Sequence, residues 1–419
     1  MSAAPEDPSL DAAVPLRPYA PEAGKNEPQR VRVYYGTNRE ALVPVTSPVW
    51  MRVVAISGLL LLALIVVQVV GSLRRWSYPA LTRIGVATLL VACMTGWAWN
   101  PFPGYSRTIE QSRGVVYGPR ADAQGLVHYG HCDVTLPPPG KREVGALPMS
   151  RPGWEDPDKH VILDRTELLI EEAFFAELKT KLAAMQPGGR DVFVFVHGYN
   201  VDFRSAACRT AQLCLDLEFK GIPLFFSWPS QGALIGYTAD VDEVQDSIVP
   251  IKEFLVRVAE DLNAEKVHVL AHSKGGAAVS FAIGQIDPDR KLFNQVILAA
   301  PDINANTFRR DIAPRLSKLS LRSTLYCSQT DRALRGSMLF NSYKRAGDAN
   351  EPIVIEPQLD TVDATGLDPS YLGHSYYGDC KPLIEDVRKL FGQNSEPRTR
   401  GLLEQRIGEK VYWMFKLGN

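Results

Sequence analysis

Residues 267–280 read VHVLAHSKGGAAVS, an unbroken apolar stretch that runs directly into His-Ser-Lys-Gly-Gly. This pattern predicts a buried strand that ends at His272 and a helix of small residues that starts beyond Ser273. A serine at such a turn is either a helix cap or a nucleophile lifted clear of the backbone. We favour the nucleophile, because the turn crowds the residues two before and two after the serine, and these are the small Ala271 and Gly275.

Strand and helix patterns alternate from residue 191 onward. Apolar runs such as DVFVFV are typical of strands covered on both faces, and helices between them indicate a doubly wound, mostly parallel α/β sheet. Earlier strands are predicted at 30–39 and 126–136, and residues 1–29 are predicted to be a disordered tail. The later strands are predicted at 191–197, 222–228, 266–272, 295–301, 323–329 and 352–358, with helices at 202–219, 240–262, 274–286, 304–317 and 332–340.

The composition argues against several classes of protein. The chain has 419 residues and a net charge of −1, with no basic block of the kind that binds nucleic acid. Its six cysteines form no C-x-x-C pair and no cluster with histidine at the spacing of a zinc site, so no metal site is expected. No cofactor is expected either, and the oligomeric state stays open.

Two apolar segments interrupt the soluble pattern. Residues 53–73 contain no charged side chain, and as a helix they would span about 31 Å, a full membrane crossing. The second segment, at about 80–99, is weaker and ends in Trp97 and Trp99, which suit a membrane interface. Together they predict a transmembrane helical hairpin within residues 50–100.

A serine nucleophile needs a base, and an acid that orients the base. Of the seven histidines, His374 follows the last predicted strand and is the expected base. His197 is expected to brace the backbone beside Gly198. Asp331 and Asp302 both qualify as the acid by position; we favour Asp331 and expect Asp302 to be a helix cap or a structural acceptor.

An acyl-transfer intermediate also needs N–H donors for its oxyanion. The backbone N–H of Lys274, directly after the serine, would lie at the start of the predicted helix. The second expected donor is the backbone N–H of Tyr199, which follows His197 and Gly198.

Several stretches occur in a specific order along the chain. They are VYYGTNR at 33–39, YGHCDVTLP at 129–137, VFVHGYN at 194–200, FSWPS at 226–230, AHSKGG at 271–276, AAPDI at 299–303, LYCSQTDRAL at 325–334 and LGHSYY at 372–377. Taken together they resemble the DUF900 family of esterase- and lipase-like proteins in the α/β-hydrolase superfamily. The resemblance implies an α/β-hydrolase fold and a triad of Ser273, Asp331 and His374. The chain departs from the family at Lys274, where methionine is usual, and in its apolar insertion.

The resemblance also organises the chain, because the stretches on both sides of the apolar insertion belong to one domain. An even number of membrane crossings must then separate them, which favours two transmembrane helices. The arrangement expected is a disordered tail at 1–29, the first strand of the hydrolase domain at 30–45, the hairpin at 50–100, the rest of the hydrolase domain at 115–393 and a C-terminal amphipathic helix at 394–419.

The hypothesis is a membrane-anchored serine hydrolase that cleaves carboxylic esters, with a small or lipid-like ester as substrate. The expected location is a bacterial inner membrane, and arginines in the predicted turn slightly favour an extracytoplasmic hydrolase domain. Acyl transfer remains an alternative, because it shares the acyl-enzyme with hydrolysis. A catalytically silent binding scaffold at the membrane is another, and Lys274 would then mark the lost activity. A function within the hairpin itself is disfavoured, because its apolar core has no ionisable residue.

Overall fold

The computed structural model describes the chain in two compact units. The larger comprises Met1–Ala41, Tyr117–Ser150 and Glu155–Asn419, and the smaller comprises Leu42–Val116 and Arg151–Trp154. The described residues are 27–42, 62–72, 74, 82, 84–88, 111–230, 239–287, 290–331, 343–367 and 376–416.

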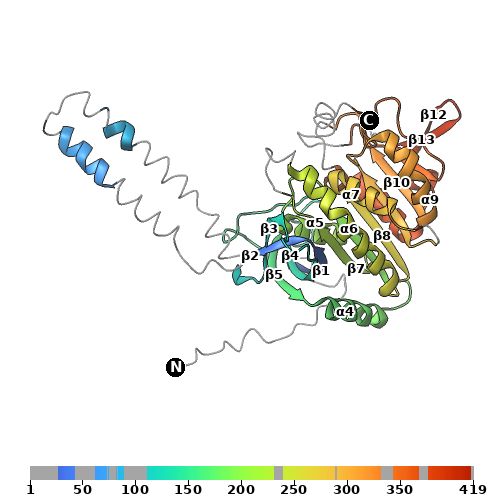
Figure 1. Cartoon of the computed structure of the whole chain (residues 1–419), viewed down its shortest axis with the longest axis horizontal. Coiled ribbons are helices and arrows are strands. Elements are labelled where there is room, and N and C mark those ends of the chain that lie inside the picture. The colour runs from blue at the N-terminus through green and yellow to red at the C-terminus, as the bar shows by residue number, and fades with distance from the viewer. Residues whose placement is uncertain are drawn as a thin grey trace. The chain divides into compact units, whose positions relative to one another are not determined.

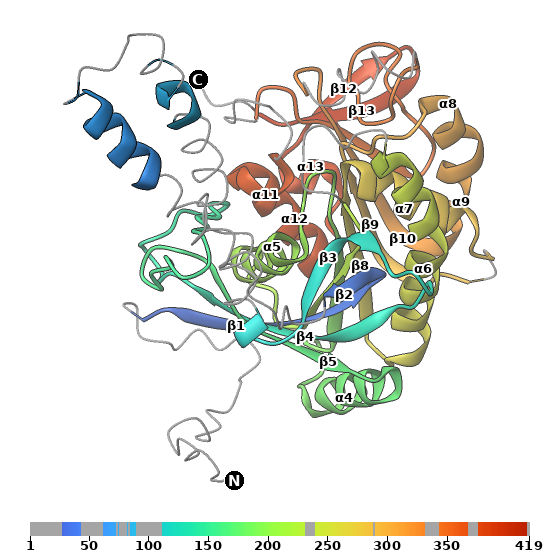
Figure 2. The ribbon, with the colours of Figure 1, turned by 60° about the vertical axis from the view of Figure 1, so that its left-hand side comes forward.

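An eleven-stranded sheet forms the centre of the larger unit (Figures 1 and 2). Neighbouring strands from β13 across to β1 are all parallel, whereas β4 and β5 at one edge and β12 at the other are antiparallel to their neighbours. The strands in spatial order are β12 (Leu403–Ile407), β13 (Lys410–Met414), β11 (Leu359–Asp363), β10 (Ser320–Cys327), β9 (Phe293–Ala299), β8 (Lys266–His272), β6 (Asp191–Val196), β7 (Ile222–Ser227), β1 (Gln29–Thr37), β4 (His128–Leu136) and β5 (Ile162–Leu169).

Both faces of the sheet are buried, as the apolar strands predict. In β6, Val192 and Val194 join the core cluster that includes α4, α6 and α7, while Phe193 packs against Phe219 and Phe391 on the opposite face. This alternation confirms a doubly wound α/β sheet. The helices are α4 (Glu171–Ala184), α5 (Phe203–Asp216), α6 (Ala239–Asp261), α7 (Ser273–Gly284), α8 (Ala305–Thr307), the π-helix η2 (Phe308–Ile312), α9 (Ala313–Leu319), α11 (Tyr376–Asp379), α12 (Lys381–Gln393) and α13 (Pro397–Arg400).

Two predicted elements are wrong. The strand expected at 352–358 is irregular, and β11 starts at Leu359, after a turn in which Gln358 has a φ of +60°. In place of the C-terminal helix expected at 394–419, the described residues form the short helix α13 and the hairpin of β12 and β13, which turns at Gly408 with a φ of +61°. Val411, Tyr412 and Trp413 are β-branched and aromatic residues, which favour a strand beside β11 over a helix. The helix predicted at 332–340 lies outside the described residues.

The smaller unit contains short helical stretches at 62–72 and 84–88. None of the helices among the described residues is both long and apolar enough to cross a membrane. The hairpin predicted within residues 50–100 is therefore not confirmed, and 24 of the 41 residues in its two segments, 53–73 and 80–99, fall outside the described residues. At the root of this insertion, β2 (Arg39–Leu42) pairs with β3 (Val116–Ala121).

Candidate active site

Ser273 lies at a sharp turn between β8 and α7. His272 has extended backbone angles, with φ −120° and ψ 137°, and Ser273 then adopts a φ of +53°. A left-handed conformation is unfavourable for a residue with a Cβ, and such strain is found mainly at functional sites. The N-cap position belongs to His272 and not to Ser273, so the alternative role of this serine as the helix cap does not fit the turn.

The loop after β6 packs directly against this turn. A Cβ on Gly198 would lie 3.0 Å from the Cβ of Ser273 and 2.6 Å from Nδ1 of His272. A Cβ on Gly275 would lie 2.1 Å from the carbonyl oxygen of His197, so only glycine fits there. The small residue expected two positions after the serine is thus required because the backbone of the loop after β6 lies against it. This close approach brings Tyr199 and Lys274 near each other at the Ser273 turn.

His197 braces this loop, as the sequence predicts. Its Nδ1 lies 2.8 Å from the carbonyl oxygen of Gly198, and its Nε2 lies 3.1 Å from Oγ of Ser227. Trp228 stacks on the imidazole at 5.2 Å between ring centroids and donates its indole N–H to the carbonyl of His197 at 2.7 Å. Burial, and secondarily the charge of Arg39, lower the pKa of His197 to about 3. The imidazole is therefore neutral, and its contacts hold the backbone of the loop in place.

The two candidate acids follow adjacent strands. The sheet register places His272 beside Ala299 and Ala299 beside Tyr326, so β8, β9 and β10 end at one level. Asp331 follows β10 by four residues and is 1% exposed. Two inter-strand steps of about 4.8 Å separate the ends of β8 and β10, a gap of about 10 Å that an imidazole can bridge.

Asp302 has the structural role expected of it. Its Oδ1 lies 3.0 Å from Nε of the buried Arg345, and its backbone N–H donates to the carbonyl of Ser273 at 3.1 Å. An acid that neutralises a buried arginine is poorly placed to orient an imidazole. The expected base, His374, lies outside the described residues, in the connection between β11 and α11.

Lys274 packs against the loop after β6, which carries Tyr199. The residue is 4% exposed, and its Nζ lies 5.1 Å from the centre of the Tyr199 ring, a cation–π contact. The two residues expected to donate backbone N–H groups to the oxyanion therefore also pack against each other through their side chains.

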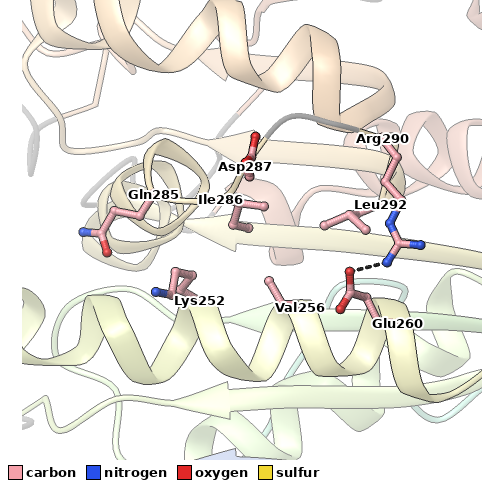
Figure 3. A pocket seen from close by; sticks show the side chains of 8 residues that line it. All are labelled: Lys252, Val256, Glu260, Gln285, Ile286, Asp287, Arg290 and Leu292. Carbon is pink, nitrogen blue, oxygen red and sulfur yellow. Dashed lines mark hydrogen bonds and ion pairs between the residues drawn. The ribbon is translucent and has the colours of Figure 1, made fainter.

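A pocket of about 420 Å³ lies elsewhere, between α6 and the segment that follows α7 (Figure 3). Gln285, at its rim, follows the C-terminal end of α7, whereas Ser273 starts that helix, about 18 Å away along its axis. The pocket is thus separate from the candidate active site. It is lined by Lys252, Val256, Glu260, Gln285, Ile286, Asp287, Arg290 and Leu292, and Arg290 and Glu260 form an ion pair across one end.

Arg39 and Ser227 also belong to this region, and sequence reasoning assigned no role to either. Arg39 is 1% exposed, and its Nη2 lies 3.5 Å from Nε2 of His197. Their positions could have indicated a role, because Arg39 ends VYYGTNR and Ser227 ends β7. Both stretches end at the edge of the sheet that carries Ser273.

The family described as alpha/beta hydrolase of unknown function (DUF900) matches residues 171–387. The chain belongs to this family. The match covers α4 to most of α12, and so includes the Ser273 turn and the loop that packs against it. The resemblance read from the sequence is confirmed at the level of the family and its fold.

Solved structures of esterase-like proteins are also similar to the chain, at low identity. LpqC, a poly(3-hydroxybutyrate) depolymerase from Bordetella parapertussis, is 13% identical over 52% of this chain and 86% of its own, with a TM-score of 0.28. The esterase domain of a Rhodothermus marinus protein is 14% identical over 50% and 87%, with a TM-score of 0.27. A hyperthermophilic esterase from the archaeon Pyrobaculum calidifontis is 10% identical over 64% and 82%, with a TM-score of 0.30. Likenesses this weak carry no argument about the reaction. No curated protein matches the chain.

Proposed function

We propose that this α/β hydrolase is a serine hydrolase that cleaves carboxylic esters through an acyl-enzyme on Ser273. The observation that carries the proposal is the φ of +53° at Ser273, between a buried parallel strand and a helix, with Gly198 against its side chain. A turn of this kind supports the proposal, because it can hold a nucleophilic hydroxyl at the carboxyl edge of the sheet, within reach of backbone N–H donors for an oxyanion.

In the proposed reaction, Ser273 Oγ attacks the ester carbonyl and its proton passes to His374. The tetrahedral oxyanion accepts hydrogen bonds from the N–H groups of Lys274 and Tyr199. Collapse of this intermediate breaks the ester bond, and His374 protonates the departing alcohol. Water, deprotonated by His374, then releases the acid, while Asp331 holds the imidazole in the correct tautomer.

Labelling with a fluorophosphonate probe tests the nucleophile. We expect the purified wild-type protein to form a covalent adduct, and Ser273→Ala to form none. Ser280→Ala is the matched control, because Ser280 lies on the same helix, is buried and donates to the carbonyl of Gly276 at 2.7 Å. An adduct that persists in Ser273→Ala, or no adduct in the wild type, contradicts the proposal, and the second result favours a silent binding scaffold.

An ester panel of graded acyl length, with and without an alcohol acceptor, separates hydrolysis from acyl transfer. We expect free acid as the main product in both conditions. An acyl product on the acceptor that replaces the acid would instead favour a transferase that uses the same acyl-enzyme.

We also propose that the apolar insertion anchors the protein to a membrane. The described stretch at 62–72 supports this, because Leu62, Val66 and Val69 are 59%, 53% and 54% exposed. We expect the protein to stay in the membrane pellet after alkaline carbonate extraction, and Val66→Lys with Val69→Lys to release it. Leu321→Lys, at a residue 52% exposed on β10, is the matched control. Release of the wild type by carbonate would contradict the anchor.

The proposed location is a bacterial inner membrane with the hydrolase domain extracytoplasmic. Alkaline phosphatase fused after Lys416 should then be active, because this reporter needs an oxidising compartment. An inactive phosphatase, with a cytoplasmic reporter active at the same position, would reverse the orientation.

A further inference from the structure

Arg39 binds three segments of the chain around the loop that carries Tyr199. Its Nε donates to Oγ of Ser227 at 2.8 Å. Its Nη1 donates to the carbonyls of Gly118 at 3.0 Å and Ser230 at 3.2 Å, and its Nη2 donates to the carbonyl of Val201 at 2.8 Å. The planar guanidinium has donors in fixed directions, so one buried side chain holds these segments in register.

The contact with Ser227 continues toward the oxyanion loop. Because Oγ of Ser227 accepts from Arg39, its own hydrogen is available for Nε2 of His197, 3.1 Å away. Nδ1 of His197 must then carry a hydrogen, because it lies 2.8 Å from the carbonyl oxygen of Gly198, which can only accept. This assigns one tautomer to the imidazole.

The last contact sets the direction of the Tyr199 N–H. The carbonyl of Gly198 and the N–H of Tyr199 belong to the same peptide plane, and in a trans peptide they point in opposite directions. With the carbonyl of Gly198 held by His197, the N–H of Tyr199 is directed away from His197.

The far side of Tyr199 is held by the same arginine. The carbonyl of Val201 accepts from Arg39, and the N–H of Asn200 donates to Oγ of Ser230 at 2.9 Å. The carbonyl of Ser230 is itself bound by Arg39. Asn200 adopts a φ of +59°, a left-handed conformation that asparagine tolerates and that these contacts hold in place.

We propose that Arg39 is a positioning residue that directs the Tyr199 N–H at the reaction's oxyanion, through Ser227 and His197. This inference rests on the proposed serine hydrolase function. A misdirected donor weakens binding of the transition state far more than binding of the substrate, since the oxyanion exists only in the former. The expected signature is therefore a loss in kcat with little change in KM.

Ser227→Ala and Arg39→Lys test the relay. Ser227→Ala removes one hydroxyl, and Arg39→Lys keeps the charge but loses the planar set of donors. Arg32→Met is the matched control, because Arg32 lies on β1, is half-buried and binds Asp133 at 2.7 and 2.8 Å. We would measure kcat and KM with p-nitrophenyl butyrate, and Ki for a trifluoromethyl ketone that forms an oxyanion on the serine.

Both relay variants should lower kcat by about 10- to 100-fold and raise Ki by a similar factor, with KM within about threefold of the wild type. Arg32→Met should keep all three values. If Arg39→Lys does not fold, Ser227→Ala alone decides. Values of kcat and Ki in Ser227→Ala that match those of Arg32→Met overturn the inference, as does a rise in KM with Ki unchanged.

Wild-type protein that hydrolyses no ester contradicts the proposed function, and the positioning role is lost with it. The relay is tested separately by ¹⁵N NMR of the histidines, with His197 assigned from His197→Asn. We expect a neutral ring protonated at Nδ1. A His197 ring protonated at Nε2 overturns the inference even if the enzyme is active.

Discussion

A Cβ atom on Gly275 would lie 2.1 Å from the carbonyl oxygen of His197, closer than any relaxed contact allows. The first turn of α7 and the loop after β6 therefore meet backbone to backbone. This contact places Lys274, which precedes Gly275, next to Tyr199, which follows Gly198. The glycine two residues after the serine thus permits these two chain segments to approach each other at the Ser273 turn.

Gly275→Ala should therefore disrupt the site. The new methyl group meets a backbone atom that is itself held by Trp228, so relief requires the loop or the helix to move. We expect a loss of about 3 kcal/mol in the free energy of unfolding, measured in urea, and loss of any Ser273-dependent labelling. Gly276→Ala is the control, because its Cβ would lie 3.2 Å from Cβ of Pro301, a contact that small shifts can relieve. Equal stability of both variants would contradict this account.

The left-handed backbone of Ser273 predicts that glycine at this position gives a more stable protein than alanine. Glycine adopts a φ of +53° without the steric cost that any Cβ brings, while alanine keeps that cost. We expect Ser273→Gly to be more stable than Ser273→Ala by about 1 kcal/mol in denaturant unfolding, and both to be inactive. If the alanine variant is at least as stable as the glycine variant, the turn is not strained.

Much of this region could be predicted from the sequence, because its signals are local. DVFVFV and KVHVLAH are apolar without interruption, as central parallel strands must be, and both form strands within one residue of the prediction. The turn at Ser273 could be read from the small residues around it. The acid and base remain predictions: Asp331 follows β10 as expected, and His374 lies outside the described residues.

The role of Arg39 could not be predicted, because its burial depends on partners far away in sequence. An arginine after a strand usually faces solvent, and this one is buried only because Gly118, Val201 and Ser227 supply acceptors. The C-terminal hairpin was not predicted, for a related reason. Its apolar residues fit a helix in isolation, and pairing with β11 decides in favour of a strand.

Substitution of the two candidate acids should affect different properties, the stability for Asp302 and the reaction rate for Asp331. Asp302→Asn leaves the buried Arg345 without its carboxylate, 3.0 Å away, and should lower the free energy of unfolding by about 3 kcal/mol. Asp331→Asn should lower kcat by about 10⁴-fold, as expected for a triad acid, and should leave KM little changed. Ester hydrolysis and urea unfolding of both variants check this. If Asp302→Asn alone abolishes kcat in a protein of full stability, the assignment of the acid is wrong.

His197 makes stability fall at acid pH. Burial, and then Arg39, lower its pKa in the folded protein from 6.5 to about 3. Between these values the unfolded chain binds a proton that the folded chain excludes, so stability falls as pH decreases, by about 1.4 kcal/mol per pH unit from this group. His268 and His131, whose pKa values are lowered mainly by burial, add in the same direction.

His197→Asn isolates the contribution of His197. The asparagine amide can still donate to the carbonyl of Gly198, as Nδ1 does, but it does not titrate. Urea unfolding between pH 4 and 6.5 should therefore show that the free energy of unfolding falls less steeply with decreasing pH in this variant than in the wild type. The difference in slope should be about 1.4 kcal/mol per pH unit, the value for one proton. Identical slopes would mean that the folded protein protonates His197 as readily as the unfolded chain, and would contradict the lowering of its pKa by burial and by the charge of Arg39.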